Sequence, residues 1–161
     1  MLPQLFYRGQ MLIKLIKAII MTNDTTLNRF IEAQTLNYAD ALAEIKNGKK
    51  RTHWMWYIFP QIQGLGFSEF ARFYAIKDLT EAEAYLKHPI LGTRLLDISR
   101  ALLTLAGNDP YPIFGSPDDM KLHSSMTLFA HTPGADPVFQ QVLDKFYNGR
   151  QDLKTMKILN P

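Results

Sequence analysis

The chain has 161 residues, of which 47% are hydrophobic, 12% aromatic and 20% charged. That size and composition indicate one folded domain with a buried core and exclude a disordered chain. It holds no cysteine, which excludes disulfides, thiolate metal sites and a cysteine nucleophile, and its formal net charge is +3 at pH 7.

The first twenty residues hold the whole excess of positive charge. Arg8, Lys14 and Lys17 stand there without any acidic residue, which leaves 15 of the 18 basic residues to face all 15 acidic ones in the rest of the chain. A neutral body lacks the electrostatic footprint of a general nucleic-acid-binding protein. We therefore expect no nucleic-acid partner.

The same segment, residues 1–20, is open to three interpretations. It could be a dispensable extension from an upstream translation start, with Met21 as the native start. It could be an amphipathic helix on a surface or membrane, or a signal peptide. The lysines interrupt its apolar run and no small-residue cleavage site follows, which argues against a signal peptide. The run is also too short and too charged to span a membrane. For residues 21–161 we expect a single helical domain without membrane association.

The first predicted helix of this domain runs from about Leu27 to Asn47. Thr26 is suited to cap its start, its apolar residues roughly follow a period of 3.6, and Gly48 ends it. The basic triplet at positions 49–51 then follows the negative end of the helix dipole, where cations are favoured.

The next segment, HWMWYIFPQIQGLGFS at positions 53–68, is aromatic and then rich in glycine. It predicts a helical turn over Trp54–Phe59 followed by a loop. A buried strand over Met55–Phe59 remains open, because periodicity cannot separate the two at this length. The tryptophans either form a platform that stacks a flat ring or simply pack in the core.

Two short helices are predicted after this loop. Ser68 is expected to cap the first, over Glu69–Ile76. Thr80 and Glu83 stand three residues apart and predict a capping box at the start of the second, Glu81–Lys87.

A longer helix is predicted from about Ile90 to Leu105, with Pro89 in its first turn and Gly107 beyond its end. Its leucines and isoleucine recur at alternating spacings of four and three, which is typical of a core-facing stripe. The stripe consists of Leu91, Leu95, Ile98, Leu102 and Leu105.

The residues NDPYPIFG at positions 108–115 are predicted to form a loop. Ser116 and Pro117, followed by two aspartates, then predict the start of a helix that runs to about Ala130.

The last helix starts are marked by aspartate. Asp136, followed by proline, predicts a helix over Val138–Tyr147, which Gly149 ends, and Asp152 begins a short terminal turn or helix. The sequence therefore predicts an all-α fold: a compact single domain of six or seven short-to-medium helices with an aromatic, glycine-containing loop.

No metal or cofactor motif is present. The four histidines do not stand at zinc-ligand spacings, and GLGFSEF lacks the third glycine of a dinucleotide fingerprint. No Walker lysine motif or G-x-S-x-G elbow occurs either. We expect no metal and no cofactor.

The segment FGSPDDMKLHSSMTLF, positions 114–129, is unusual for a purely structural helix. Asp118, Lys121 and Ser125 fall on one helical face. Ser124 and Ser125 are weak helix formers in mid-helix, so the sequence indicates either a close helix crossing or a polar patch.

Three runs of the chain resemble a known family: HWMWYIFPQIQGLGFSEFARFYAI, EAEAYLKHPILGTRL and IFGSPDDMKLHSSMTLF. They are similar to the uncharacterised bacterial family called domain of unknown function 1810, over about Leu27 to Thr155. The resemblance implies a compact, mainly helical, cytoplasmic bacterial protein, and residues 1–20 lie outside it. It implies no activity. The label calpastatin that the family sometimes receives has no physical support, because that inhibitor type is disordered.

One functional hypothesis is a pocket between segments 53–68 and 114–129 that binds a small phosphate-bearing ligand, either a nucleotide or an ADP-ribose-like molecule. If the pocket also hydrolyses the ligand, Asp118 is the candidate acid or base, with Lys121 holding an anion and His53 a second catalytic candidate. The predicted ligand-binding residues are Trp54, Trp56, Gln61, Ser68, Arg72, Lys121 and Ser125.

The alternative is a protein-interaction or regulatory module without chemistry. In that case the aromatic loop and the serine face bind a partner protein or a second copy, and Arg72 is a surface salt-bridge partner instead of a fork for phosphate. The sequence leaves open whether the protein is an enzyme and what its oligomeric state is.

Overall fold

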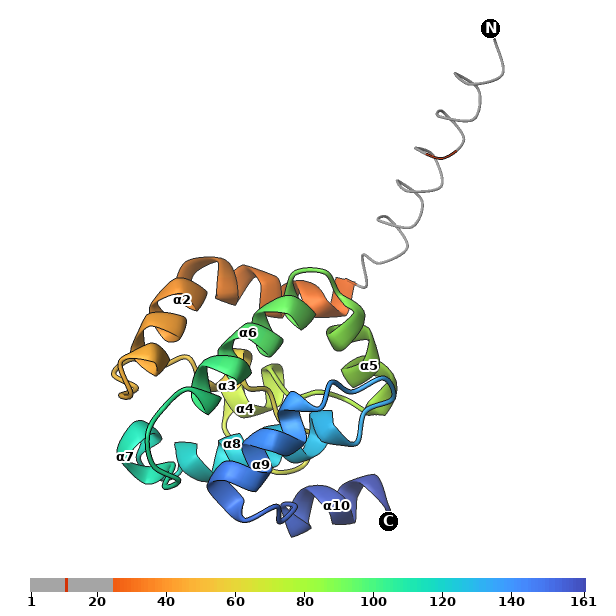
Figure 1. Ribbon diagram of the computed structural model, residues 1–161. Coiled ribbons are helices and arrows are strands. Elements are labelled where there is room, and N and C mark those ends of the chain that lie inside the picture. The colour runs from red at the N-terminus through yellow and green to blue at the C-terminus, as the bar shows by residue number, and fades with distance from the viewer. Residues whose placement is uncertain (1–10, 12–24) are drawn as a thin grey trace, which may run out of the picture.

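Helix α6, Leu91–Leu103, lies at the centre of the fold (Figure 1). It packs against α2, α5 and α9, while α8 packs against α9 and α10. The computed structural model describes residue 11 and residues 25–161. Its elements in chain order are η1 (Thr25–Leu27), α2 (Asn28–Lys46), α3 (Met55–Ile58), α4 (Glu69–Phe73), α5 (Leu79–Lys87), α6, α7 (Tyr111–Phe114), α8 (Asp118–Ala130), α9 (Val138–Tyr147) and α10 (Leu153–Leu159).

The predicted all-α class is confirmed, since the described residues hold helices and no strand. They form nine α-helices rather than six or seven, because one-turn helices are counted separately and α7 forms where a loop was predicted. α3 is helical, so the alternative of a strand there is wrong. The interpretations of residues 1–20 lie outside the described residues, except for the single position Met11.

The stripe on α6 is buried as predicted over its first four members, and Leu105 beyond the helix is partly buried. Gly92 explains how α6 approaches α5 so closely. A Cβ at Gly92 would stand 2.0 Å from the carbonyl oxygen of Leu86, so any side chain there would force the two helices apart. The adjoining His88 accepts hydrogen bonds from two backbone amides at the start of α6 through Nδ1.

Several helix starts differ from the predictions. Asp78, not Thr80, caps α5, since its Oδ1 accepts from the Glu81 amide at 2.9 Å. Thr80 lies inside the helix. The N-cap positions of α2 and α8 are Leu27 and Pro117, which lack a side-chain cap bond, so the caps predicted at Thr26 and Ser116 are also corrected.

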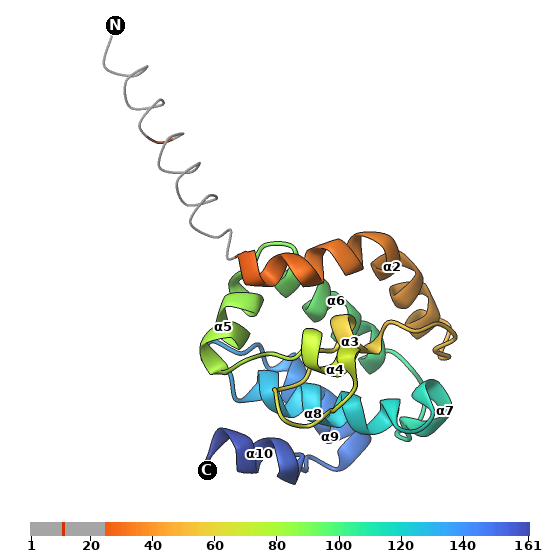
Figure 2. The ribbon, with the colours of Figure 1, turned by 180° about the vertical axis from the view of Figure 1, so that it is seen from behind.

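A backbone pairing, which we call the clip, joins the two ends of the segment from Ile62 to Ile76, which we call the α4 excursion. Ile62 and Ile76 form an isolated parallel bridge, in which the Ile76 amide donates to the Gln61 carbonyl at 2.8 Å. This pairing ends α4 at Phe73 instead of Ile76. The clip keeps α4 beside α3 and α8, as the view from behind shows (Figure 2). Ser68 caps α4 as predicted, accepting from the Ala71 amide at 3.1 Å.

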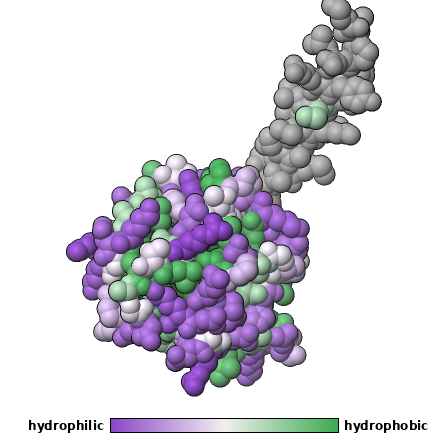
Figure 3. Space-filling model, in the orientation of Figure 1, coloured by the Kyte–Doolittle hydropathy of each residue, from purple (hydrophilic) through white to green (hydrophobic). Residues whose placement is uncertain are grey.

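The surface on the other side of the molecule, seen in Figure 3, is mainly hydrophilic, with hydrophobic residues gathered near its centre. Within the part of the chain that the structure describes, no helix combines the length and the apolar character needed to cross a bilayer.

Candidate functional site

The loop of segment 53–68 and helix α8 meet at a small hollow, which we call the Lys121 hollow. Its volume is about 200 Å³. Apolar side chains and backbone form part of its wall, and amide, hydroxyl, ammonium and carboxylate groups complete it, as in many ligand sites. Its lining residues are Gln61, Leu65, Gly66, Ala71, Pro117, Met120, Lys121, Ser124, Asp152 and Lys154.

Gly66 lets the loop lie against α4 at this hollow. A Cβ built on Gly66 would stand 2.5 Å from the Cβ of Ala71, closer than two such carbons can approach. This glycine in the predicted loop therefore allows close contact between the loop and the helix.

Asp118 joins two lysines at the edge of the hollow. Its Oδ1 lies 3.3 Å from the Lys121 Nζ, and its Oδ2 lies 2.9 Å from the Lys50 Nζ. Each lysine also lies over a tryptophan ring: Lys121 stands 5.0 Å from the centroid of Trp56, and Lys50 stands 5.1 Å from that of Trp54. Both contacts are cation–π interactions, and they fix the direction of the two ammonium groups.

Trp54 is a core residue rather than a ligand platform. It is 1% exposed, does not line the hollow, and its ring packs near Phe59 and Phe114. Its Nε1 donates to the Glu44 carboxylate at 2.8 Å. This placement corrects the prediction that Trp54 binds a ligand, because a ring enclosed on both faces offers no surface for stacking.

Glu44 organises the turn that leads into Trp54. Its carboxylate accepts from the amides of Arg51 and Thr52, from the Thr52 hydroxyl and from the Trp54 indole. Burial alone would raise the pKa of Glu44, but these hydrogen bonds outweigh it and lower the pKa from 4.5 to about 2. The basic triplet therefore does more than follow a helix end, because the amide of its last residue, Arg51, is held by this carboxylate.

Trp56 differs from Trp54 in exposure and in neighbours. It is half-buried, and its ring lies 5.3 Å from that of Phe70 on α4. Phe70 is 59% exposed, and Phe67 and Phe73 on the same excursion are 78% and 58% exposed. Trp56 thus connects the Lys121 ammonium to an exposed aromatic surface.

The two serines of α8 have different roles. Ser124 lines the hollow, and its Oγ donates to the Met120 carbonyl at 3.1 Å. Ser125 is fully buried, and its Oγ has no hydrogen-bond partner among the described residues. The prediction that Ser125 binds a ligand is therefore corrected: the second half of α8 is buried on nearly all sides, so Ser125 serves close helix packing.

The remaining predicted site residues are divided. Gln61 and Lys121 line the hollow. Trp56 and Asp118 contact Lys121 without lining the hollow, and His53, Ser68 and Arg72 do not line it either. His53 is exposed, and its backbone carbonyl accepts from the Tyr57 hydroxyl. No contact within the described residues joins His53 to Asp118, so the two catalytic candidates do not form a pair.

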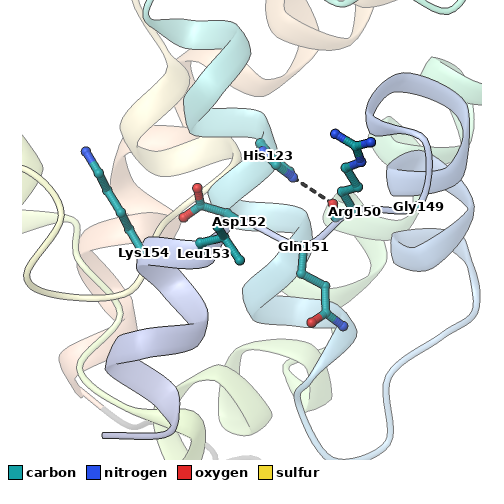
Figure 4. A pocket seen from close by; sticks show the side chains of 7 residues that line it. All are labelled: His123, Gly149, Arg150, Gln151, Asp152, Leu153 and Lys154. Atoms are coloured by element: carbon teal, nitrogen blue, oxygen red, sulfur yellow. Dashed lines mark hydrogen bonds between the residues drawn. The ribbon is translucent and has the colours of Figure 1, made fainter.

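A second hollow, which we call the His123 hollow, was not predicted from the sequence. Its volume is about 630 Å³. Figure 4 shows it, with the residues that line it: His123, Gly149, Arg150, Gln151, Asp152, Leu153 and Lys154. The His123 ring stacks on Tyr147 with centroids 4.1 Å apart and an interplanar angle of 7°. Most of its lining comes from the segment between α9 and α10, which the sequence indicated only as a helix end.

Neither hollow presents a recognisable metal centre. In the described part of the chain, no group of three or more histidine, aspartate or glutamate side chains is placed to hold a metal ion. That no cofactor is needed stays a prediction.

Comparisons with known proteins identify relatives without an assigned activity. Residues 24–159 match the family model described as a protein of unknown function, DUF1810. The crystal structure of the conserved hypothetical protein Rv1873 from Mycobacterium tuberculosis is similar, with a TM-score of 0.82 and 44% sequence identity. The match covers 84% of this chain and 96% of that one. No curated protein matches the chain.

Proposed function

The chain belongs to the DUF1810 family, and we propose that it binds a small phosphate-bearing ligand, a nucleotide or an ADP-ribose-like molecule, in the Lys121 hollow. The observation that supports this most directly is the position of Lys121. Lys121 lines the hollow and its ammonium group lies over the neighbouring Trp56 ring. Leu65 and Met120 supply apolar wall of the hollow, and Gln61 supplies an amide. An ammonium beside an aromatic ring suits a ligand that joins an anion to a flat ring.

The charges around the hollow favour an anion. Its charged lining residues are Lys121, Lys154 and Asp152, which leaves one excess positive charge. Beside the hollow, Asp118 and Lys50 offset each other as an ion pair. The Lys154 ammonium has no hydrogen bond or ion pair with the residues that the structure describes, so it is available to a phosphate.

Binding is supported better than hydrolysis. Both oxygens of Asp118 are already engaged by ammonium groups, so this carboxylate is suited to orienting the lysines. A general acid or base must instead reach the reacting atom, and His53 does not line the hollow.

Isothermal titration with AMP tests the proposal, with adenosine as the uncharged comparison. We expect AMP to bind more tightly than adenosine and Lys121→Met to weaken AMP binding about tenfold, as expected when one charged contact is lost. Lys157→Met is the matched control, since Lys157 is an exposed lysine that lines neither hollow. Equal AMP affinities for Lys121→Met and the control would contradict the proposal.

One observation favours the second candidate function, an interaction module. Three phenylalanines on one short excursion, Phe67, Phe70 and Phe73, are each more than half exposed, and such clusters often mark interaction sites. If they mediate self-association, sedimentation velocity will detect a concentration-dependent dimer that Phe70→Ser abolishes. If the protein is a monomer at all concentrations, these phenylalanines do not mediate self-association.

A further inference from the structure

From the position of the second hollow we infer that the ligand is two-ended: one end occupies the Lys121 hollow, the other occupies the His123 hollow, and a diphosphate bridges them past Lys154. The inference rests on the proposed function, because it assigns the first end to the Lys121 hollow. It narrows the ligand class from any phosphate ester to diphosphate-linked molecules with a group on each side.

The two hollows share part of their lining. Asp152 and Lys154, at the start of α10, line both of them. In Figure 4, Lys154 and Arg150 lie on opposite sides of Asp152. A ligand that occupies both hollows would therefore pass the start of α10, beside Asp152 and Lys154.

The volumes favour a ligand larger than a monophosphate. Sites for drug-sized ligands span about 300–1,000 Å³. The Lys121 hollow, at about 200 Å³, is below that range, whereas the His123 hollow, at about 630 Å³, is within it. The smaller hollow is thus suited to one end of a ligand whose bulk lies in the larger one.

Arg150 and Lys154 provide charge for the bridge. Within the described residues, neither the guanidinium of Arg150 nor the ammonium of Lys154 forms a hydrogen bond or an ion pair. The Asp152 carboxylate that lies between them is engaged as the cap of α10, since its Oδ2 accepts from the Thr155 amide and hydroxyl. Lys154, which lines both hollows, and Arg150, which lines the His123 hollow, match the two negative charges of a diphosphate.

His123 offers a polar group to the second end. Its Nε2 lies 2.7 Å from the Arg150 carbonyl oxygen, which can only accept, so Nε2 donates. That bond and the stacking on Tyr147 fix the ring. Nδ1 has no partner among the described residues and remains available to a hydroxyl group, such as those of a sugar.

The test is isothermal titration of the full chain with ADP-ribose, AMP and ribose 5-phosphate. We expect ADP-ribose to bind at least about tenfold more tightly than either monophosphate. Arg150→Met should weaken ADP-ribose binding about tenfold and leave AMP unchanged, whereas Lys121→Met should weaken both. Arg51→Met is the control, since Arg51 is exposed and lines neither hollow.

The outcomes separate this inference from the proposed function. Equal affinities for AMP and ADP-ribose, with Arg150→Met silent, would overturn the two-ended ligand and leave AMP binding at Lys121 intact. Binding of ADP-ribose that depends on Arg150 but not on Lys121 would overturn the bridge, because one hollow would suffice. Absence of binding by all three probes would overturn both. A thermal unfolding curve for each variant confirms that it is folded.

Discussion

Trp54 and Trp56 stand two residues apart, and each has a lysine over its ring, yet they belong to different parts of the molecule. Trp54 is enclosed by the core and hydrogen-bonded to Glu44. Trp56 lies between Lys121 and the exposed Phe70. Asp118 pairs with both lysines, so one carboxylate links the buried surroundings of Trp54 to Lys121 and its hollow.

The difference follows from helical geometry. Residues advance by about 100° each around a helix, so two positions apart they point to nearly opposite sides. Aromatic residues that are neighbours in the sequence therefore need not share one surface of the protein. We expect Trp54 to contribute mainly to stability and Trp56 mainly to ligand binding.

The largest expected effect is on stability at Trp54. Trp54→Ala removes a fully buried ring and the indole bond to Glu44, and should lower the free energy of unfolding by about 3–5 kcal/mol. Trp56→Ala should cost less than half as much, because its ring is only half-buried. Urea denaturation measures both. Equal losses of unfolding free energy in the two variants would contradict the assignment of Trp54 to the core and Trp56 to the half-buried surface.

Glu44→Gln should lower the free energy of unfolding by about 2–3 kcal/mol near neutral pH, because an amide cannot accept the same set of hydrogen bonds. The lowered pKa of Glu44 also sets a pH dependence. The carboxylate contributes stability above its unfolded pKa of 4.5, and that contribution is lost as pH falls through the folded value of about 2. Urea denaturation at pH 6 and pH 3 should show the gap between wild type and variant narrowing in acid; a constant gap would contradict the assignment.

Asp118→Asn tests the link that this carboxylate makes between Lys50 over Trp54 and Lys121 over Trp56. It leaves two lysines without their shared counter-ion and should cost about 1–2 kcal/mol of stability. AMP binding should be retained or strengthened, because the hollow gains one positive charge. Titration calorimetry measures it, and loss of binding in a folded variant would mean that Asp118 itself contacts the ligand.

The smallest stability effect is expected for Trp56→Phe. The free energy of unfolding should change by about 0.5 kcal/mol or less, because a flat ring is retained at a half-buried position. AMP affinity should still fall about threefold, since a smaller ring gives weaker stacking and a weaker cation–π contact with Lys121. Phe73→Leu is the control, since Phe73 is exposed on α4 and does not line the hollow.

The fold was largely predictable because its signals are local. The stripe on α6 and the cap at Ser68 follow from the spacing of neighbouring residues, and both were confirmed. The start of α5 was misassigned because two pairs have capping-box spacing, Asp78 with Glu81 and Thr80 with Glu83, and spacing alone does not choose between them. Glu81 also pairs with Arg29 of α2, since its Oε1 lies 2.6 Å from that guanidinium. That ion pair with a distant helix favours the first pair, and the local sequence does not indicate it.

The site was predictable only in part for the same reason. Lys121 and Gln61 lie together because two unusual segments do meet. Spacing alone could not tell which tryptophan faces inward, nor that α8 is covered beyond Lys121, which buries Ser125. The His123 hollow was missed because its polar groups come from α8 and a distant connection, each unremarkable by itself. The stacking of His123 on Tyr147 appears only in three dimensions.

The two tryptophans also give the protein a pair of optical reporters, since the chain holds no others. The emission of an indole depends on the polarity of its surroundings. Trp54, enclosed and bonded to Glu44, should shift only when the core opens. Trp56, whose ring lies 5.0 Å from the Lys121 ammonium, should respond through Lys121 to an occupant of the hollow while the fold stays intact. Fluorescence of Trp56 in the unlabelled protein can therefore screen for ligands, and Trp56→Phe identifies its contribution by subtraction.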